Sequence, residues 1–395
     1  MIPTAINYLS DYNARFNNRI PDTVEAIYAP DLSDADISLF SAIASSPAFE
    51  GQRIALMPDA HPAKASFVGL VATYTDRICP AIVSGDIGCG VLLVPVKPPK
   101  KGADLGSFDK AVKSAVPMGV GKIHSVPTTS FDGTRFRCWD SLSSRDKVDR
   151  YLGTLGSGNH FIELDRDDNT GRWWLAIHSG SRNLGTMVYE HYQHRAYDAC
   201  LEAGITNHDS EELPYLSAYV SGQDLDDYIH DAGTAAEFAA ANRSEMARAI
   251  LKASGWKEDR TRERIDCRHN YIDAKLGIVR KGAISAKAGE SIVVPLNMAD
   301  GIVIGIGRGE GSWLWSAPHG AGRTMGRKEA RETISMGDYR RRMQDAGVWS
   351  SCVSTATVDE APQVYKDADM IVESLGETID ITARLRTVYN AKGGK

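Results

Sequence analysis

Short apolar runs rich in β-branched residues recur along the chain, and each ends in a glycine or a polar turn. Runs of this kind, bounded by Gly, Pro and Asp, favour extended structure. They predict strands over 53–61, 81–97, 172–181, 283–296 and 300–309. Residues with functional groups gather at the ends of these runs, so the strand-end loops are the places to look for a site.

Other segments place their apolar residues at helical spacing. In 31–46 an apolar stripe is formed by Ile37, Phe40 and Ile43. Ser33 or Asp31 is the candidate N-cap of this helix. Further helices are predicted over 186–204, 234–255 and 327–347.

The mixture of strands and helices predicts an α+β fold, with mixed or antiparallel sheets flanked by helices and with loops that converge on one cleft. The chain contains no tandem repeat, low-complexity tract or Pro/Ser-rich linker. A single domain over 1–395 is therefore the simplest interpretation.

Composition adds little to this picture. The formal net charge of -6 gives no overall basic footprint, so a nucleic acid would have to be bound by a local patch. The 6 cysteines form no C-x-x-C pair and no signal peptide opens the chain, which predicts reduced thiols and a cytoplasmic location. No apolar run approaches the roughly 18 residues that cross a bilayer, so no membrane role is expected.

Several candidate ligands for a metal lie at the strand ends. SGDIGCG supplies a carboxylate and a thiol, Asp86 and Cys89, which a turn can direct at one ion; the same pattern also fits a buried cysteine in a turn. LGTLGSGNHFIEL packs glycines before Asn159 and His160, so backbone N–H groups could bind an anion beside an imidazole. Glu163 follows in the same stretch.

Two further histidines complete the candidate set. IHSGSRNLG carries His178 with Arg182, a donor suited to phosphate, and CRHNY carries His269, which fits either a ligand or a residue of an apolar strand. One carboxylate, one thiol and three imidazoles exceed the needs of a closed tetrahedral site. Two metal ions that share a bridging thiolate would accommodate all five, and donor softness alone favours zinc.

His319 lies in SAPHGAGR, outside any periodic apolar pattern. A neutral imidazole beside divalent cations could attack the α-phosphorus of a nucleoside triphosphate and form a phosphoramidate. Gly320 and Gly322 would keep the approach open, and Arg323 could hold phosphate oxygens. The alternative is a sixth metal ligand.

The remaining histidines that we considered lie in polar or helical surroundings with no ligand-like context. No functional role is expected for His124, His191, His194, His208 and His230.

The blocks DIGCG, LGTLGSGNHFIEL, HSGSRNLG, RKGAISAKAGE, SAPHGAGR and EAPQVYKDAD, with VYNAKG near the C-terminus, together resemble the RtcB-type RNA ligases. The blocks occur in the family's order from about residue 56 to the end. No single block would be specific enough.

The resemblance implies GTP- and Mn(II)-dependent joining of RNA ends, in RNA repair or tRNA splicing. An RNA end with a 2',3'-cyclic phosphate or 3'-phosphate would be joined to a 5'-hydroxyl end, with GMP carried on His319. Two Mn(II) ions would replace the zinc that softness favours. The resemblance also adds an archease-like activator as a candidate partner.

The resemblance also assigns roles to residues of this chain. The implied metal ligands are Asp86, Cys89, His160, His178 and His269. The implied guanylate contacts are Asn159, Glu163, His319, Tyr365 and Lys392, and Gly320, Gly322 and Arg323, proposed above from the residues themselves, complete the expected nucleotide-binding set. Basic residues expected near RNA phosphates are Arg182, Arg280 and Lys281.

The chain departs from the family pattern in three places. MPDAHPAKASFVG has Pro62, Ala63 and Ala65 where the family has a glycine-rich stretch. The segment 295–298 reads PLNM where P-G-S-M is common, and two residues, Gly394 and Lys395, follow the K-G ending. Two other functions remain as alternatives: a dimetal phosphoesterase that acts on RNA ends, and an RNA-end-binding protein with a decayed active site.

Overall fold

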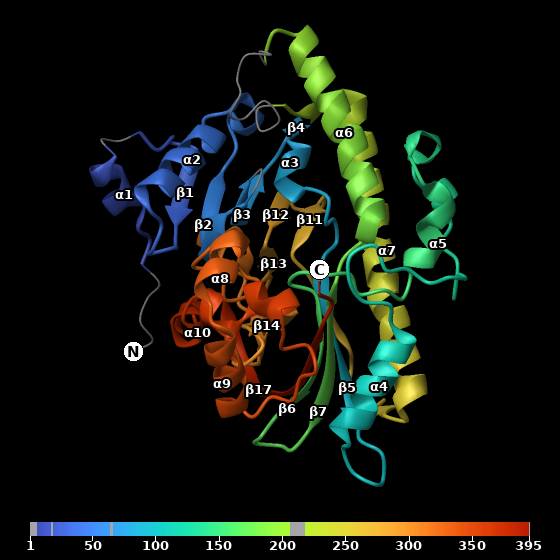
Figure 1. Cartoon of the computed structure of the whole chain (residues 1–395). Coiled ribbons are helices and arrows are strands. Elements are labelled where there is room, and N and C mark those ends of the chain that lie inside the picture. The colour runs from blue at the N-terminus through green and yellow to red at the C-terminus, as the bar shows by residue number, and fades with distance from the viewer. Residues whose placement is uncertain (1–5, 17–18, 64–65, 206–217, 395) are drawn as a thin grey trace.

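A computed structural model describes residues 6–16, 19–63, 66–205 and 218–394. Figure 1 shows the N-terminal elements on one side of the molecule, two long helices on the other, and the C-terminal helices below the N-terminal elements. Within the described ranges, no helix has both the length and the apolar character needed to cross a membrane. The mixture of helices with largely antiparallel sheets confirms the predicted α+β class.

The N-terminal part is built on a sheet whose strands far apart in the sequence lie side by side. Its strand order is β1 (Val24–Ile27), β2 (Ile54–Pro62), β3 (Phe67–Thr73), β12 (Ile278–Lys281) and β11 (Asn270–Asp273). The β1–β2 pair is parallel and the other pairs are antiparallel. The helices α1 (Leu9–Arg15) and α2 (Asp34–Ala44) share a hydrophobic core with this sheet. Residues 270–281 thereby bring the middle of the chain next to the N-terminal strands.

A larger antiparallel sheet forms the centre of the molecule. Its order is β10 (Ile265–Arg268), β5 (Gly90–Lys97), β7 (Trp173–Ser179), β6 (Phe161–Arg166), β17 (Ile379–Lys392), β15 (Ile302–Gly307) and β14 (Ser291–Pro295). The short strand β9 (Lys257–Glu258) pairs with β5. Two small pairs are formed by β13 (Ala283–Ser285) with β16 (Ser316–Pro318), and β4 (Arg77–Ile78) with β8 (Val220–Ser221).

Helices pack against the apolar faces of these sheets. The longest, α7 (Gly222–Ser254), places Met246, Ala247 and Ile250 against the central sheet beside α4 (Leu105–Ala115). The others are α3 (Pro80–Val83), α5 (Val148–Tyr151), α6 (Arg182–Glu202), α8 (Arg327–Thr333), α9 (Met336–Asp345) and α10 (Ala368–Leu375). Short 3-10 turns are Pro47–Phe49, Gly133–Arg135, Trp139–Ser141, Arg145–Lys147, Gly311–Trp313, Thr355–Glu360 and Pro362–Val364.

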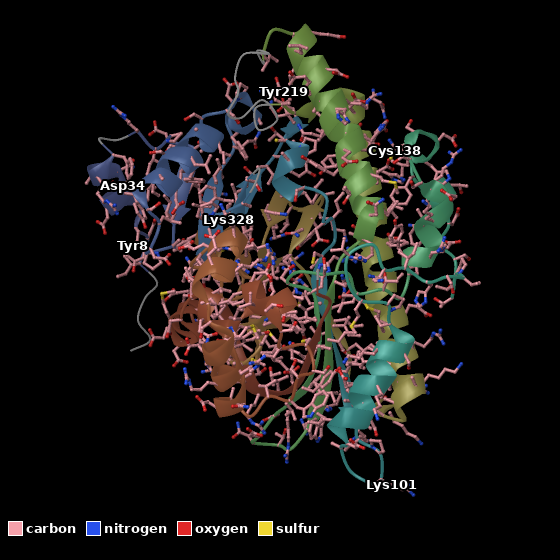
Figure 2. All side chains as sticks on the ribbon, in the orientation of Figure 1. Tyr8, Asp34, Lys101, Cys138, Tyr219 and Lys328 are labelled. Atoms are coloured by element: carbon pink, nitrogen blue, oxygen red, sulfur yellow. The ribbon has the colours of Figure 1, made fainter. Side chains whose placement is uncertain are left out.

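The segment before α5 is tied to the two long helices by one buried carboxylate. Asp231 of α7 accepts hydrogen bonds from the backbone N–H of Arg137 (2.8 Å) and Cys138 (3.0 Å), and from the hydroxyl of Tyr192 on α6 (2.8 Å). Cys138 is labelled beside these helices in Figure 2. The helical layer is thereby linked by polar contacts as well as by apolar packing.

Most predicted elements are present, with shifted boundaries. Ser33 caps α2 and forms a capping box with Asp36, so Asp31 is free for another role. The prediction of a strand from residue 81 was wrong, because Pro80 occupies the first turn of α3 and the strand β5 begins only at Gly90. The predicted helix over 327–347 is two helices, α8 and α9, since Ser335 starts the second as its N-cap.

Candidate functional site

The turn between α3 and β5 holds Asp86 and Cys89 close together. The backbone N–H of Cys89 donates to the carbonyl of Asp86 (3.2 Å), and the N–H of Gly88 donates to the carbonyl of Asn270 (2.7 Å). Gly88 has φ +70°, and a Cβ there would lie 2.4 Å from Cα of Ala236 on α7. Only glycine suits this position, because the turn needs a left-handed backbone and close contact with the helix.

The three imidazoles reach the same point from neighbouring strands. His160 directly precedes β6, and His178 on β7 pairs with Phe161 of β6 and Val91 of β5. His269 lies between β10 and β11, and its backbone N–H donates to the carbonyl of Cys89 (2.8 Å). The register of the central sheet therefore determines how these residues meet.

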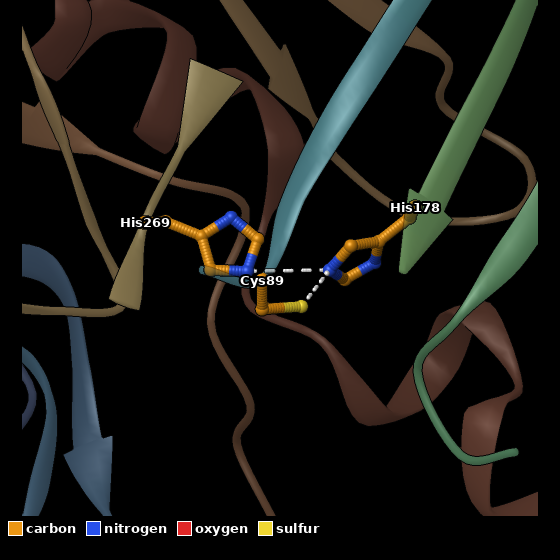
Figure 3. Close-up of side chains that lie close together, drawn as sticks. All are labelled: Cys89, His178 and His269. Atoms are coloured by element: carbon orange, nitrogen blue, oxygen red, sulfur yellow. Dashed lines mark hydrogen bonds between the residues drawn. The ribbon is translucent and has the colours of Figure 1, made fainter. Parts of the chain in front are cut away.

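Two donor groups result, and Cys89 belongs to both. Its Sγ lies 3.2 Å from Nε2 of His178, which lies 3.2 Å from Nε2 of His269; Figure 3 shows this group. The same Sγ lies 3.4 Å from Nε2 of His160, which lies 3.3 Å from Oδ2 of Asp86. Each group brings three ligand atoms within 4.8 Å of one another. All five sequence-predicted donors are thus brought together.

The protonation of the imidazoles suits metal binding. Nδ1 of His160 faces the carbonyl of Leu155 (2.9 Å), and Nδ1 of His178 faces the carbonyl of Asn159 (3.2 Å). A carbonyl only accepts, so Nδ1 of each ring carries a proton, and Nε2 is the atom that would bind a metal ion. Burial lowers the pKa of His178 and of His269 well below the ordinary value, which keeps both rings neutral.

The pKa values of the two acidic donors, Asp86 and Cys89, are shifted in opposite directions. Burial would raise the pKa of Asp86, but His160 holds it below its ordinary value. Burial, reinforced by Asp86, raises the pKa of the Cys89 thiol well above its usual range. A divalent cation would have to displace that proton, as it does when a thiolate becomes a ligand. The mixed S, N and O donor set fits divalent transition metals.

His319 lies directly beside this cluster. Its ring centroid is 4.7 Å from that of His269. Its Nδ1 lies 2.7 Å from Oδ2 of Asp59, and its backbone N–H donates to the same oxygen (3.2 Å). Asp59 is fully buried on β2, so an N-terminal strand orients a histidine from the C-terminal part of the chain.

Two glycines in the loop that carries His319 allow it to pack closely against neighbouring backbone. Gly322 has φ +72°, and a Cβ there would lie 2.3 Å from the carbonyl oxygen of Asp59. Any larger residue would push the loop of His319 away from β2. At Gly320 a Cβ would lie 3.0 Å from the carbonyl oxygen of Pro295, a tighter contact than side chains normally make.

A cavity of about 1020 Å³ opens beside His319 and the donor groups. Glu163, Asn159 and Lys392 line it, together with His319, Gly320, Gly322, Arg323 and Tyr365. Asn390 donates from Nδ2 to Oε1 of Glu163 (2.6 Å), and Nζ of Lys392 donates to the carbonyl of Asn159 (3.2 Å). Burial raises the pKa of Glu163 to about 7, against the effects of Asn390 and Lys392.

One carboxylate organises the other wall of the cavity. Glu360 accepts from the hydroxyl of Tyr365 (2.6 Å) and pairs with Lys392 (3.5 Å), Arg323 (3.4 Å) and Arg327. Burial alone would raise the pKa of Glu360, but Lys392 and the two arginines lower it to about 2. Three of the side chains expected to contact a nucleotide, Arg323, Tyr365 and Lys392, are therefore held by one buried anion.

The three predicted phosphate-binding cations differ in their surroundings. Lys281 lines the cavity and donates to the carbonyl of Val83 (3.0 Å) and the hydroxyl of Ser84 (2.6 Å). Arg182, at the start of α6, donates from Nε to the hydroxyl of Thr154 (3.2 Å). Arg280 is fully buried away from the cavity lining, where it binds Ser316 (2.8 Å), Tyr271, Asp273 and the carbonyl of Trp315.

Four of the five histidines set aside are described, and none of these four belongs to a donor group. His124 and His230 contact the carbonyls of Gly153 (3.2 Å) and Arg135 (2.8 Å). His191 and His194 belong to α6, and His208 lies outside the described residues.

Sequence reasoning did not single out three polar residues of the cavity region: Asp59, His61 and Glu360. Nδ1 of His61 faces the carbonyl of Asp59 (2.9 Å), and burial lowers the pKa of His61 to about 4. For Asp59 and His61 the sequence did offer a signal, the MPDAH stretch, in which a carboxylate and a histidine end an apolar run.

Two of the departures from the family pattern face the cavity. Pro62 and Ala63 line it near His61, whereas Ala65 lies outside the described residues. The whole stretch 295–298 lines it as well. Within that stretch Asn297 accepts from the backbone N–H of Ala299 (2.9 Å) and Asp300 (3.1 Å), so its side chain closes a local turn. At the chain end, Gly394 is described and Lys395 is not.

Comparison with known proteins gives consistent matches. The family model described as "tRNA-splicing ligase RtcB" matches residues 40–143 and 135–393. The RNA-splicing ligase RtcB1 of an Escherichia coli strain is 31% identical over 381 residues, covering 87% of this chain and 90% of the relative. The RNA-splicing ligase RtcB of Escherichia coli K12 is 30% identical with the same coverage. The tRNA-splicing ligase RtcB of Aeropyrum pernix is 27% identical over 428 residues, covering 86% and 87%. The family match spans both donor groups and His319.

Proposed function

The chain belongs to the RtcB family of RNA-splicing ligases, and on that premise we propose that it is a GTP- and Mn(II)-dependent RNA ligase acting as one domain. Its substrates are an RNA end with a 2',3'-cyclic phosphate or 3'-phosphate and an RNA end with a 5'-hydroxyl. The observation that carries this proposal is the position of His319. The ring lies between a carboxylate that orients it and a cluster of metal donors, on the wall of a cavity large enough for a nucleotide.

His319 is suited to act as a nucleophile. The carboxylate of Asp59 accepts a hydrogen bond from Nδ1–H of His319, so that in the neutral ring the lone pair for attack is on Nε2. Attack on the α-phosphorus of GTP forms an N–P bond, breaks the P–O bond to pyrophosphate, and leaves GMP on the histidine. The fixed ring avoids the entropic cost of orienting it in each turnover.

The remaining residues have binding roles. The Glu163 carboxylate, held by Asn390, is suited to accept from the guanine edge, and Lys392 supplies a donor beside it. Arg323 and Lys281 contribute positive charge where phosphate oxygens would lie. Asp86, Cys89, His160, His178 and His269 would hold two Mn(II) ions, which when bound neutralise phosphate charge and orient the reacting groups.

Three further steps complete the reaction. The cyclic phosphate is hydrolysed to a 3'-phosphate. An oxygen of that phosphate then attacks the phosphorus on His319, the N–P bond breaks, and an anhydride joins GMP to the RNA end. Finally the 5'-hydroxyl attacks the RNA phosphorus, GMP leaves, and a phosphodiester remains.

The proposal is tested by incubating the purified protein with Mn(II) and α-labelled GTP, and following label on the protein. We expect label on the wild type and none on His319→Ala. Absence of label on the wild type would refute the ligase mechanism. Loss of the cyclic phosphate without joining would favour the dimetal phosphoesterase, and binding of RNA ends without any turnover would favour a decayed enzyme.

A further inference from the structure

Lys366 is a buried cation whose donors are all engaged. Its side chain is 3% exposed, between the 3-10 turn Pro362–Val364 and α10. The ammonium donates to Oδ1 of Asp31 (2.6 Å) and to the carbonyls of Pro58 (3.1 Å) and Ala60 (3.0 Å). A lysine has three donors, so these three acceptors satisfy it completely.

The two carbonyls belong to the residues on either side of Asp59. The ladder between β2 and β3 is regular up to Leu56 and resumes at His61, with a register shift between them. In a bulge the ladder no longer supplies partners to every backbone group, and buried carbonyls need other donors. Lys366 provides these donors at the point where β2 presents Asp59 to His319.

The counter-charge comes from the N-terminal segment. Asp31 lies before residue 40, where the match to the family begins. Its backbone is fixed from two sides, because the hydroxyl of Tyr12 donates to the carbonyl of Ala29 (3.1 Å) and accepts from the N–H of Leu32 (3.1 Å). A buried ammonium is costly without a paired anion, and Asp31 supplies that anion for Lys366.

The same lysine also contacts the loop that carries His319. Its backbone N–H donates to the carbonyl of Gly322 (3.1 Å), in the loop that passes against Asp59. Lys366 thus bonds to the strand that carries the carboxylate and to the loop that carries the imidazole. A displacement of about 1 Å in such a pair can lower a rate about 100-fold.

We propose that Asp31 and Lys366 are positioning residues that set the distance between Asp59 and His319, so that the N-terminal segment completes the active site. This inference rests on the proposed function, since it assigns the pair to guanylylation of His319. Both residues line the cavity, but the ammonium of Lys366 is engaged by Asp31 and the two carbonyls, so neither residue is expected to touch the reacting atoms. Their effect should appear in the rate of phosphoramidate formation and not in nucleotide affinity.

The decisive variant is Asp31→Asn, because Asp31 is 42% exposed and the fold should tolerate the change. Asp31→Glu is the conservative variant, and Lys366→Met removes the ammonium itself. Glu25→Gln is the matched control: Glu25 is 37% exposed in the same part of the molecule and loses an ion pair with Arg53 (2.5 Å). Each protein is measured for its single-turnover labelling rate at several GTP concentrations and for its melting temperature.

We expect Asp31→Asn to lower the rate at saturating GTP about 10-fold, within the range seen when a supporting partner is removed. The half-saturating GTP concentration should change less than about threefold, and the melting temperature should match that of Glu25→Gln. Asp31→Glu should restore most of the rate, and Lys366→Met should lower the rate further than Asp31→Asn.

Three results would overturn the inference: a wild-type labelling rate in Asp31→Asn, an equal loss in Glu25→Gln, or a change confined to GTP affinity. An unlabelled wild type would instead refute the proposed function, so the two failures are distinguishable. If Lys366→Met does not fold, the comparison of the two Asp31 variants still decides.

Discussion

Replacing Cys89 with alanine should remove both metal ions, whereas replacing one of the outer histidines should remove only one. Cys89 belongs to both donor groups found among the described residues. His160 belongs to the group with Asp86, and His269 belongs to the group with His178. The variants Cys89→Ala, His160→Ala and His269→Ala therefore separate the two sites.

Each donor group has three ligand atoms, so the loss of one should weaken metal binding strongly. Loss of a partner that merely supports a ligand already weakens metal affinity about 10- to 100-fold. Loss of one of three ligands should cost at least the upper end of that range. At a free metal concentration of 100 times Kd, one site adds about 2.7 kcal/mol to the free energy of unfolding. Cys89→Ala should therefore lose about 5 kcal/mol of metal-dependent stabilisation, and each histidine variant about half of that.

Equilibrium dialysis at a free Mn(II) concentration of about ten times the wild-type Kd, followed by elemental analysis, gives the number of ions bound, because a site weakened 100-fold is then only about one-tenth occupied. Urea unfolding with and without Mn(II) gives the stabilisation. We expect two ions in the wild type, one in each histidine variant and none in Cys89→Ala. Retention of one ion by Cys89→Ala, or removal of both ions by His160→Ala, would show that the thiolate is not shared.

Four other outcomes are expected. Asp59→Asn should lower the His319 labelling rate about 10- to 100-fold with little change in melting temperature, because the side chain keeps its shape but loses its charge. Gly322→Ala should lower both the labelling rate and the melting temperature, since its Cβ would lie 2.3 Å from the carbonyl oxygen of Asp59. Mn(II) affinity, measured by dialysis, should rise about tenfold per pH unit below the raised pKa of Cys89, because binding displaces the thiol proton. Glu163→Gln should reduce the preference for GTP over ATP in competition labelling, because an amide also donates where the carboxylate only accepts.

The sequence was sufficient to select the five side chains that the structure brings together as candidate metal donors, because each lies at the end of an apolar run or in a glycine-rich turn. His160 directly precedes β6 and His178 lies near the end of β7, and the β6–β7 register brings their rings to a centroid distance of 5.2 Å. The partition of the donors was not predictable. It depends on where the turn of Cys89 lies relative to His269, which is set by long-range backbone hydrogen bonds.

Several residues that the sequence did not single out contact partners that are distant along the chain. Asp59 meets His319 across a separation of 260 positions, and Lys366 meets Asp31 across 335. A carboxylate in a strand or a lysine after a 3-10 turn has no local signature for such a role. Helix α3 was missed for a local reason, since the apolar residues of 81–83 fit a strand as well as a buried helical turn.

For the proposed RNA ligase, the charges around the cavity bear on how an acidic chain would act on RNA ends. Arg323 and Lys392 are paired with Glu360, and Lys366 is paired with Asp31, so most of this positive charge is compensated within the protein. Lys281 and Arg182 instead donate to neutral groups, but of the two only Lys281 lines the cavity, and Asp86 is an anion in its surroundings. Affinity for a long RNA backbone grows with the number of phosphates that are neutralised, and one such cation neutralises few. A site with this charge distribution is suited to a terminal phosphate and not to an extended strand, which agrees with a net charge of -6.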